Sequence, residues 1–195
     1  MKNNLSKSLL LLASASVLFA TSIHAQDAKS TVPLALDLPL HTLKGTPEDL
    51  PGGPNIEPLS DVAPTPVQVP KGVKNVAAGI TATSSVAPFL GESFAIHAIA
   101  MWHDHRYVQA MHDVILQVSD DPEFKSGVTT LYNNDTDNSS GLGVGTDREY
   151  FELQFGRVVA AKGIKARYVR GFTRGSNQSS LNCWQEIEVY ALPAK

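Results

Sequence analysis

The stretch that decides the fold lies in the last third of the chain: Ala166-Arg-Tyr-Val-Arg170, a polar loop over residues 173–182, and Trp184-Gln-Glu-Ile-Glu-Val-Tyr190. The flanking runs are rich in β-formers, whereas Gly, Ser and Asn dominate the loop. Two such runs around a turn-forming segment predict neighbouring antiparallel strands. The pattern is typical of the closing strands of a secreted β-sandwich, and it favours a binding module over a catalytic domain.

Further strands are predicted upstream, and no window keeps a helical period over the length that a helix needs. The short strands alternate with loop signals, which predicts an all-β fold built as a jelly-roll sandwich. The predicted strands cover residues 76–83, 94–102, 113–119, 128–132, 149–155, 163–172 and 184–191.

The first 25 residues read as a secretory signal peptide. Lys2 and Lys7 precede an apolar run over residues 9–20, and Ala25 ends the segment at a small residue. This pattern predicts cleavage after Ala25 and export to the periplasm or the extracellular space. The apolar run is too short for a good membrane span, so we expect no span after cleavage.

Residues 26–72 are dominated by proline, which removes backbone donors and forces extended geometry. We interpret them as an extended tether and prefer a semi-rigid spacer. The alternative is that the tether lies across the folded domain through its leucines. The sandwich domain then covers residues 73–195. The leucines concerned are Leu34, Leu36, Leu38 and Leu40.

Cys183 is the only cysteine, so no internal disulfide can form. No Cys-His signature surrounds it, and we predict a buried or half-buried packing residue. The formal net charge is −3, and Lys and Arg form no run. A nucleic-acid partner is therefore excluded by the charge pattern.

Residues 114–190 resemble the discoidin, or coagulation factor 5/8 type C, family. The likeness rests on Leu116-Gln-Val-Ser-Asp-Asp-Pro-Glu-Phe124, on Ala166–Arg170 and on Glu186-Ile-Glu-Val-Tyr190. A bacterial exported subgroup is similar in Trp102-His-Asp-His105 and in a loop such as the one at residues 132–143. The resemblance implies the galactose-binding-like jelly roll and a non-catalytic function in binding carbohydrate or a surface glycan.

The chain departs from this family before the strand at residues 94–102. The family's Asp-Gly turn and the strand after it have no counterpart there, since Gly91-Glu-Ser93 leads directly into Phe94. We therefore expect a sandwich that is one strand short, with an open edge that invites pairing with another chain. The resemblance also places Glu186 at the position of a carboxylate that helps to hold a structural calcium ion.

Three residues near the closing strands are candidate ligand-binding residues: Trp184, Arg170 and Asn182. Trp184 borders the polar loop and could stack on a sugar ring, although packing at the rim of the core explains it as well. Arg170 could bind carboxylates or sugar hydroxyls, and its alternative is a structural pair across the sheet.

Two sets of residues are candidate metal ligands. His103 and His105 share one face of a strand, and a neighbouring strand could add His112 to a zinc or copper site. Simple hydrogen bonding is the competing interpretation. Asp135 and Asp137, with Ser139 at the next alternate position, offer the hard oxygen ligands that calcium requires. Asx-turn chemistry explains this loop equally well.

The sequence thus predicts an exported, non-catalytic module that binds carbohydrate or a cell-surface glycan, with calcium as the candidate cofactor. Glu186 and Glu188 share a strand face, and nothing places two carboxylates across a cleft as a glycosidase requires. The alternative function is a structural or protein-interaction module of the cell envelope that docks a partner protein.

Overall fold

The computed structural model describes residues 30–38, 50–81, 89–103, 107–181 and 183–194, so the signal-peptide prediction lies outside the described residues. These ranges contain strands and loops and no helix, which confirms the all-β prediction. The strands are β1 (Thr31–Pro33), β2 (Gln68–Pro70), β3 (Lys74–Asn75), β4 (Phe89–Trp102), β5 (Gln109–Met111), β6 (Ile115–Ser119), β7 (Thr129–Asn133), β8 (Tyr150–Glu152), β9 (Arg157–Phe172) and β10 (Glu186–Pro193). The described residues therefore contain no apolar helix of membrane-spanning length.

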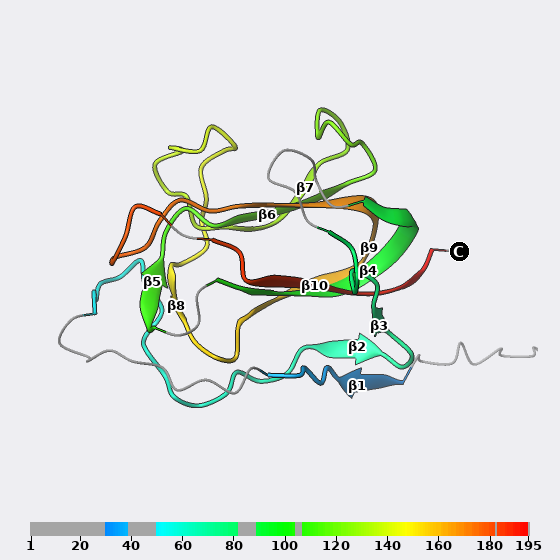
Figure 1. Ribbon diagram of the computed structural model, residues 1–195, viewed down its shortest axis with the longest axis horizontal. Coiled ribbons are helices and arrows are strands. Elements are labelled where there is room, and N and C mark those ends of the chain that lie inside the picture. Colours follow the sequence, from blue (N-terminus) through cyan, green and yellow to red (C-terminus); the bar gives the residue numbers. More distant parts are fainter. Residues whose placement is uncertain (1–29, 39–49, 82–88, 104–106, 182, 195) are drawn as a thin grey trace, which may run out of the picture.

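Six strands form one antiparallel sheet in the order β3-β10-β4-β9-β6-β7. The long strand β9 pairs with β4 through residues 157–168 and with β6 through residues 168–172, so the two partners overlap at Tyr168. Because β9 changes partners along its length, the sheet bends into two facing layers (Figure 1). The short pair β5-β8 stands at one end of these layers.

The core lies between the two layers. Most of its fully buried side chains come from β4, β6 and β9, and Met111 of β5, Val114 and Val189 of β10 complete it. The largest contributors are Ile96, Ile99, Met101, Leu116, Val118 and Val169.

The opposite face of β4 is also buried. Ala98, Ala100 and Trp102 point away from the main core and form a second cluster with Val69. Leu34 and Leu36 pack against this cluster, and β1 and β2 form an antiparallel pair beside it (Figure 1). Burial on both faces explains why residues 94–102 of β4 are apolar except for His97.

Part of the Pro-rich region therefore forms a third layer, so the observed structure favours the alternative in which it lies across the domain. We call its described residues, 30–38 and 50–72, the N-terminal segment. The backbone amide of Leu34 donates to the carbonyl of Val67 at 2.9 Å, and Ile56 forms a bridge with Glu149. Arg157 binds Glu57 through two hydrogen bonds of 2.7 and 2.8 Å.

The observed strand boundaries differ from the predicted ones where turns intervene. The strand predicted at residues 149–155 ends at Glu152, because the amide of Gly156 closes a turn onto the carbonyl of Leu153. The strand predicted at residues 76–83 is wrong for residues 76–81, where the amide of Ile80 bonds to Ala77. Strands β1, β2 and β5 were not predicted, since short paired segments carry little periodicity.

Candidate functional site

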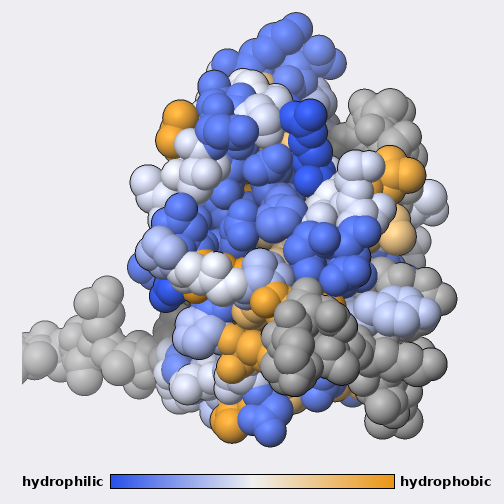
Figure 2. Space-filling view, turned by 90° about the vertical axis from the view of Figure 1, so that its left-hand side faces the viewer, coloured by the Kyte–Doolittle hydropathy of each residue, from blue (hydrophilic) through white to orange (hydrophobic). Residues whose placement is uncertain are grey.

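The polar loops gather at the end of the sandwich that carries β5 and β8. The loop after β7 and the loop after β9 both lie there (Figure 1). Seen from that side, the surface is mostly hydrophilic, with scattered apolar residues (Figure 2). Binding residues commonly occur on loops that a rigid scaffold positions, so this end of the sandwich is the candidate site.

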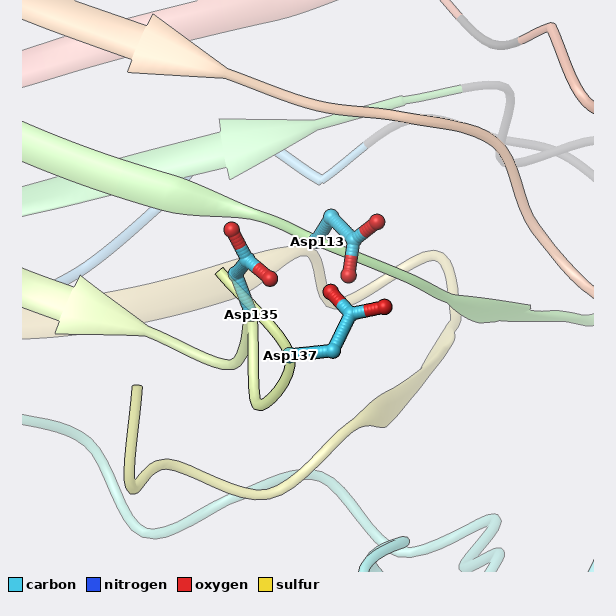
Figure 3. Close-up of side chains that lie close together, drawn as sticks. All are labelled: Asp113, Asp135 and Asp137. Carbon is cyan, nitrogen blue, oxygen red and sulfur yellow. The ribbon is translucent and has the colours of Figure 1, made fainter. Parts of the chain in front are cut away.

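Three aspartates come together at this end and form the carboxylate cluster: Asp113, Asp135 and Asp137. One oxygen from each lies within 4.8 Å of the others, and Figure 3 shows the three carboxylates facing one another. The pairing of β6 with β7 places Ile115 opposite Asn133. The residue just before β6 and the residues just after β7 must therefore be neighbours.

Asp135 is fully buried and held by backbone donors. Its carboxylate accepts hydrogen bonds from the amides of Ser139 at 3.1 Å and Ser140 at 2.9 Å. Burial opposes ionisation, but the hydrogen bonds from Ser140 and Ser139 outweigh it and hold the pKa of Asp135 below its usual value. Asp135 is therefore a carboxylate at neutral pH.

Asp137 and Asp113 are tied to the same loop through Ser139. The amide of Ser139 donates to Asp137 at 2.9 Å, and its hydroxyl donates to Asp113 at 2.9 Å. Farther along, a Cβ on Gly145 would lie 2.3 Å from the carbonyl oxygen of Asn133, so the loop closes on itself there. The Asx-turn interpretation is thus correct for the backbone, and the same turns aim the three carboxylates at one point.

The cluster concentrates negative charge, and no cation of the described residues pairs with it. None of the ion pairs between described residues involves these three carboxylates. Like charges this close raise the free energy of the ionised state unless a counter-ion joins them. Several carboxylate oxygens converging on one point are the donor set that suits calcium, so the residues fit that ion.

His103 takes part in a different arrangement, inside the sandwich. Both His103 and Glu152 are fully buried, and Nδ1 of His103 lies 3.1 Å from Oε2 of Glu152. The backbone amide of His103 donates to the same carboxylate at 3.2 Å. The hydroxyl of Tyr150 lies 3.4 Å from Nδ1, and burial together with Glu152 raises the pKa of that hydroxyl. Within the described ranges, Nε2 of His103 has no hydrogen-bond partner.

The predicted histidine metal site is not assembled by the described residues. His112 binds Glu149 at 2.8 Å through Nδ1, while His105 lies outside the described residues. Over the described part of the chain, the carboxylate cluster is the sole group of three metal-ligating residues, and neither His103 nor His112 belongs to it. Glu186 is exposed at the start of β10 and is likewise not in that group.

The candidate ligand-binding residues near the closing strands have protein partners of their own. The ring of Trp184 lies on His103 with centroids 4.2 Å apart, so that ring face is closed to a sugar. Arg170 donates to Oε1 of Gln117, its opposite residue on β6, and lies 4.3 Å over the ring of Phe124. This is the structural pair across the sheet. Asn182 lies outside the described residues.

The prediction for Cys183 is wrong, because this residue is exposed. It sits between the polar loop and β10. Trp102, by contrast, is buried in the second cluster, and its Nε1 donates to the carbonyl of Gln154 at 3.2 Å.

The sequence interpretation missed Asp113 as a member of the cluster and Glu152 as the partner of His103. The signal for Asp113 was present. It is the first residue of a predicted strand, 113–119, and the next predicted strand ends shortly before Asp135; antiparallel pairing of the two therefore places both aspartates at one edge. Glu152 could not be found in this way, because its contact with His103 joins two different layers.

Comparisons with models of known protein families, with curated proteins and with solved structures found no match.

Proposed function

We propose that this chain is an exported, non-catalytic binding module whose loop end is organised by calcium and whose ligand is a carbohydrate. The observation that carries the proposal is the carboxylate cluster: Asp113, Asp135 and Asp137 converge within 4.8 Å on a hydrophilic loop end. The resemblance of residues 114–190 to the discoidin family supports the same ligand class and the jelly-roll topology.

The electrostatics of the cluster favour metal binding over acid catalysis. A general acid needs a raised pKa so that it carries a proton near neutral pH. The pKa of Asp135 is shifted in the opposite direction by the donors around it. A carboxylate that is ionised at neutral pH serves as a metal ligand and makes a poor proton donor.

Calcium titration of the domain tests the proposal. Calcium should raise the unfolding temperature, because a ligand of the native state stabilises it by about 2.7 kcal/mol at a hundred times its Kd. Asp137→Asn should remove the effect, whereas Asp61→Asn, the same change at an exposed residue of the N-terminal segment, should leave it intact. An unfolding temperature that calcium does not move would refute the calcium site.

A glycan panel, read by calorimetry with calcium and with EDTA, tests the ligand class. We expect at least one glycan to bind in calcium and to bind more weakly in EDTA. Calcium binding without any glycan binding would leave the metal site standing and overturn the carbohydrate ligand.

The second candidate function is a protein-interaction module, and one observation favours it. Strand β7 ends the strand order of the six-stranded sheet, and among the described strands it pairs with β6 alone. A sheet edge can pair with a strand of another chain. Thr130→Pro on this edge should abolish such a complex, which sedimentation of the purified protein with its captured partner would show.

A further inference from the structure

Three residues of the N-terminal segment dock beside the start of β8 as a short parallel strand. Ile56 forms a parallel bridge with Glu149. The amide of Glu149 donates to the carbonyl of Asn55 at 2.9 Å, and the carbonyl of Glu149 accepts from the amide of Glu57 at 2.8 Å. The segment thus supplies hydrogen-bond partners to both backbone groups of Glu149. A proline flanks the docked residues on each side and has no amide hydrogen, so the docked strand is three residues long.

The docked residues are held by one buried side chain and two arginines. Ile56 is only 6% exposed, and its carbonyl accepts a hydrogen bond from Arg148. Glu57 binds Arg157 through the two hydrogen bonds described above. The chain is exposed on both sides of these residues. Undocking therefore breaks few contacts, and local opening of this kind needs much less free energy than global unfolding.

The side chain of Glu149 connects the docked strand to the carboxylate cluster. Its Oε1 lies 2.8 Å from Nδ1 of His112, the residue before Asp113. Asp113 has a φ of 49°, a left-handed conformation that a residue other than glycine keeps only where its surroundings hold it. By fixing the ring of His112, Glu149 helps to hold the backbone that presents the Asp113 carboxylate. Glu149 is therefore a positioning residue for the cluster.

A second set of contacts runs from the same stretch of chain to Asp135. The carboxylate of Asp147 accepts from the amide of Asn133 at 2.6 Å, and the amide of Asp147 donates to the carbonyl of Asn133 at 2.9 Å. The side-chain oxygen of Asn133 in turn accepts from the amide of Asp135 at 2.9 Å. Residues 147–149 thus contact the supports of two of the three aspartates.

We propose that docking of the N-terminal segment regulates the affinity of the carboxylate cluster for calcium. In the docked state, residues 147–149 are held on both sides and keep Asp113 and Asp135 converged. Undocking frees Glu149 and weakens calcium binding. Because linkage between two binding equilibria is reciprocal, bound calcium must also favour the docked state. This inference rests on the calcium site proposed above, but it concerns residues outside the three aspartates.

Calcium titration of the whole chain by calorimetry, at constant neutral pH, tests the regulation. Ile56→Asn places an amide in the buried position and should undock the strand, because an unpaired buried polar group is unfavourable. The calcium affinity should then fall about fivefold or more, as coupling between sites commonly gives. Leu59→Asn makes the same kind of change on the same segment at a residue that is 41% exposed, and it should leave the affinity unchanged.

A pair of variants at Glu149 tests the positioning role. Glu149→Ala removes the hydrogen bond to His112 and should weaken calcium binding about tenfold, the usual effect of losing a group that orients a metal ligand. Glu149→Gln removes the same charge but keeps an oxygen that can accept from His112, so it should retain most of the affinity. Equal losses in the two variants would mean that only the charge of Glu149 matters, which overturns the positioning role.

Hydrogen exchange of the Glu57 amide in the unaltered chain reports docking directly, since this amide donates to Glu149. We expect slower exchange with calcium than with EDTA. If calcium binds but does not slow this exchange, or if a folded Ile56→Asn variant keeps its affinity, the regulation is refuted while the calcium site stands. A chain that binds no calcium at all refutes both. Should Ile56→Asn fail to fold, the exchange measurement decides.

Discussion

Buried acids occur in two regions of this molecule under opposite conditions. Inside the sandwich, the carboxylate of Glu152 has a histidine ring and a backbone amide as partners, and no other acid shares that contact. At the loop end, Asp135 has backbone donors but faces two more carboxylates. The carboxylate of Glu152 thus has its hydrogen-bond partners within the protein, whereas a bound cation would reduce the repulsion among the three aspartates. We infer that the acid with the histidine partner serves stability, and that the acids facing one another serve binding.

The largest effect expected from this comparison concerns Glu152. Replacing it by Ala leaves the ring and the backbone amide of His103 without their carboxylate partner in the core, and breaking a buried pair in this way costs about 3–5 kcal/mol. Urea unfolding should show this loss, and it should be the same with calcium and with EDTA. If calcium recovered the lost stability, the distinction between the two regions would be wrong, because Glu152 would then belong to the binding site.

Asp135→Asn should have the next largest effect, about 1.5–3 kcal/mol measured in EDTA, because hydrogen bonds to a charged acceptor are lost. The pKa of Asp135 is lowered in the folded protein. Its contribution is therefore fully present above the ordinary Asp pKa of about 3.9 and is lost as the pH falls through the lower, folded value. When the free energy of unfolding is measured from neutral pH down to acid, it should fall less steeply with pH for the variant than for the parent protein. Identical pH profiles would contradict this expectation.

Gly171→Ala tests how tightly the histidine region is packed. A Cβ at this position would lie 2.7 Å from Cζ2 of Trp184, so the indole must move off His103. Overpacking of this kind costs about 1–3 kcal/mol. A change in tryptophan fluorescence should accompany the loss of stability. If stability and fluorescence both stay unchanged, Trp184 is free to move and is again a candidate for sugar stacking.

The smallest effect is expected at Glu57, which pairs with Arg157 near the protein surface. Both side chains are partly exposed, at 37% and 26%, so Glu57→Gln should cost at most about 1 kcal/mol. The loss should appear as faster amide exchange in residues 50–70, with the core unaffected. A global loss of stability would show that the N-terminal segment is integral to the core.

The all-β class and the principal strands could be predicted from the sequence, because β4, β6, β7 and β9 carry strong β-forming runs. The role of residues 30–70 could not. Proline forbids helix and central strand but does not say whether an extended chain lies free or covers a sheet. The decisive sign was in β4 itself, where Ala98 and Ala100 alternate with large residues and leave space for a covering layer.

The candidate calcium site was half predictable. Asp135 and Asp137 alternate within one loop, so local spacing suggested them. Asp113 required strand pairing to be combined with loop position. The histidines were misleading in this respect, since His103 and His112 are near in sequence, yet each binds a different glutamate from a distant segment. Proximity along the chain does not predict which side chains meet across layers.

The bend of β9 from one layer to the other has a consequence for the time at which the protein can fold. Both neighbours of β4 in the sheet lie far along the chain: β4 ends at Trp102, whereas β9 begins at Arg157 and β10 at Glu186. During synthesis, the apolar β4 run therefore leaves the ribosome without partners, and contacts between remote parts of a chain form slowly. A nascent chain that folds only after β10 has emerged depends on chaperones to prevent aggregation. The same delay keeps it unfolded for a translocation machinery, as the export that we propose requires.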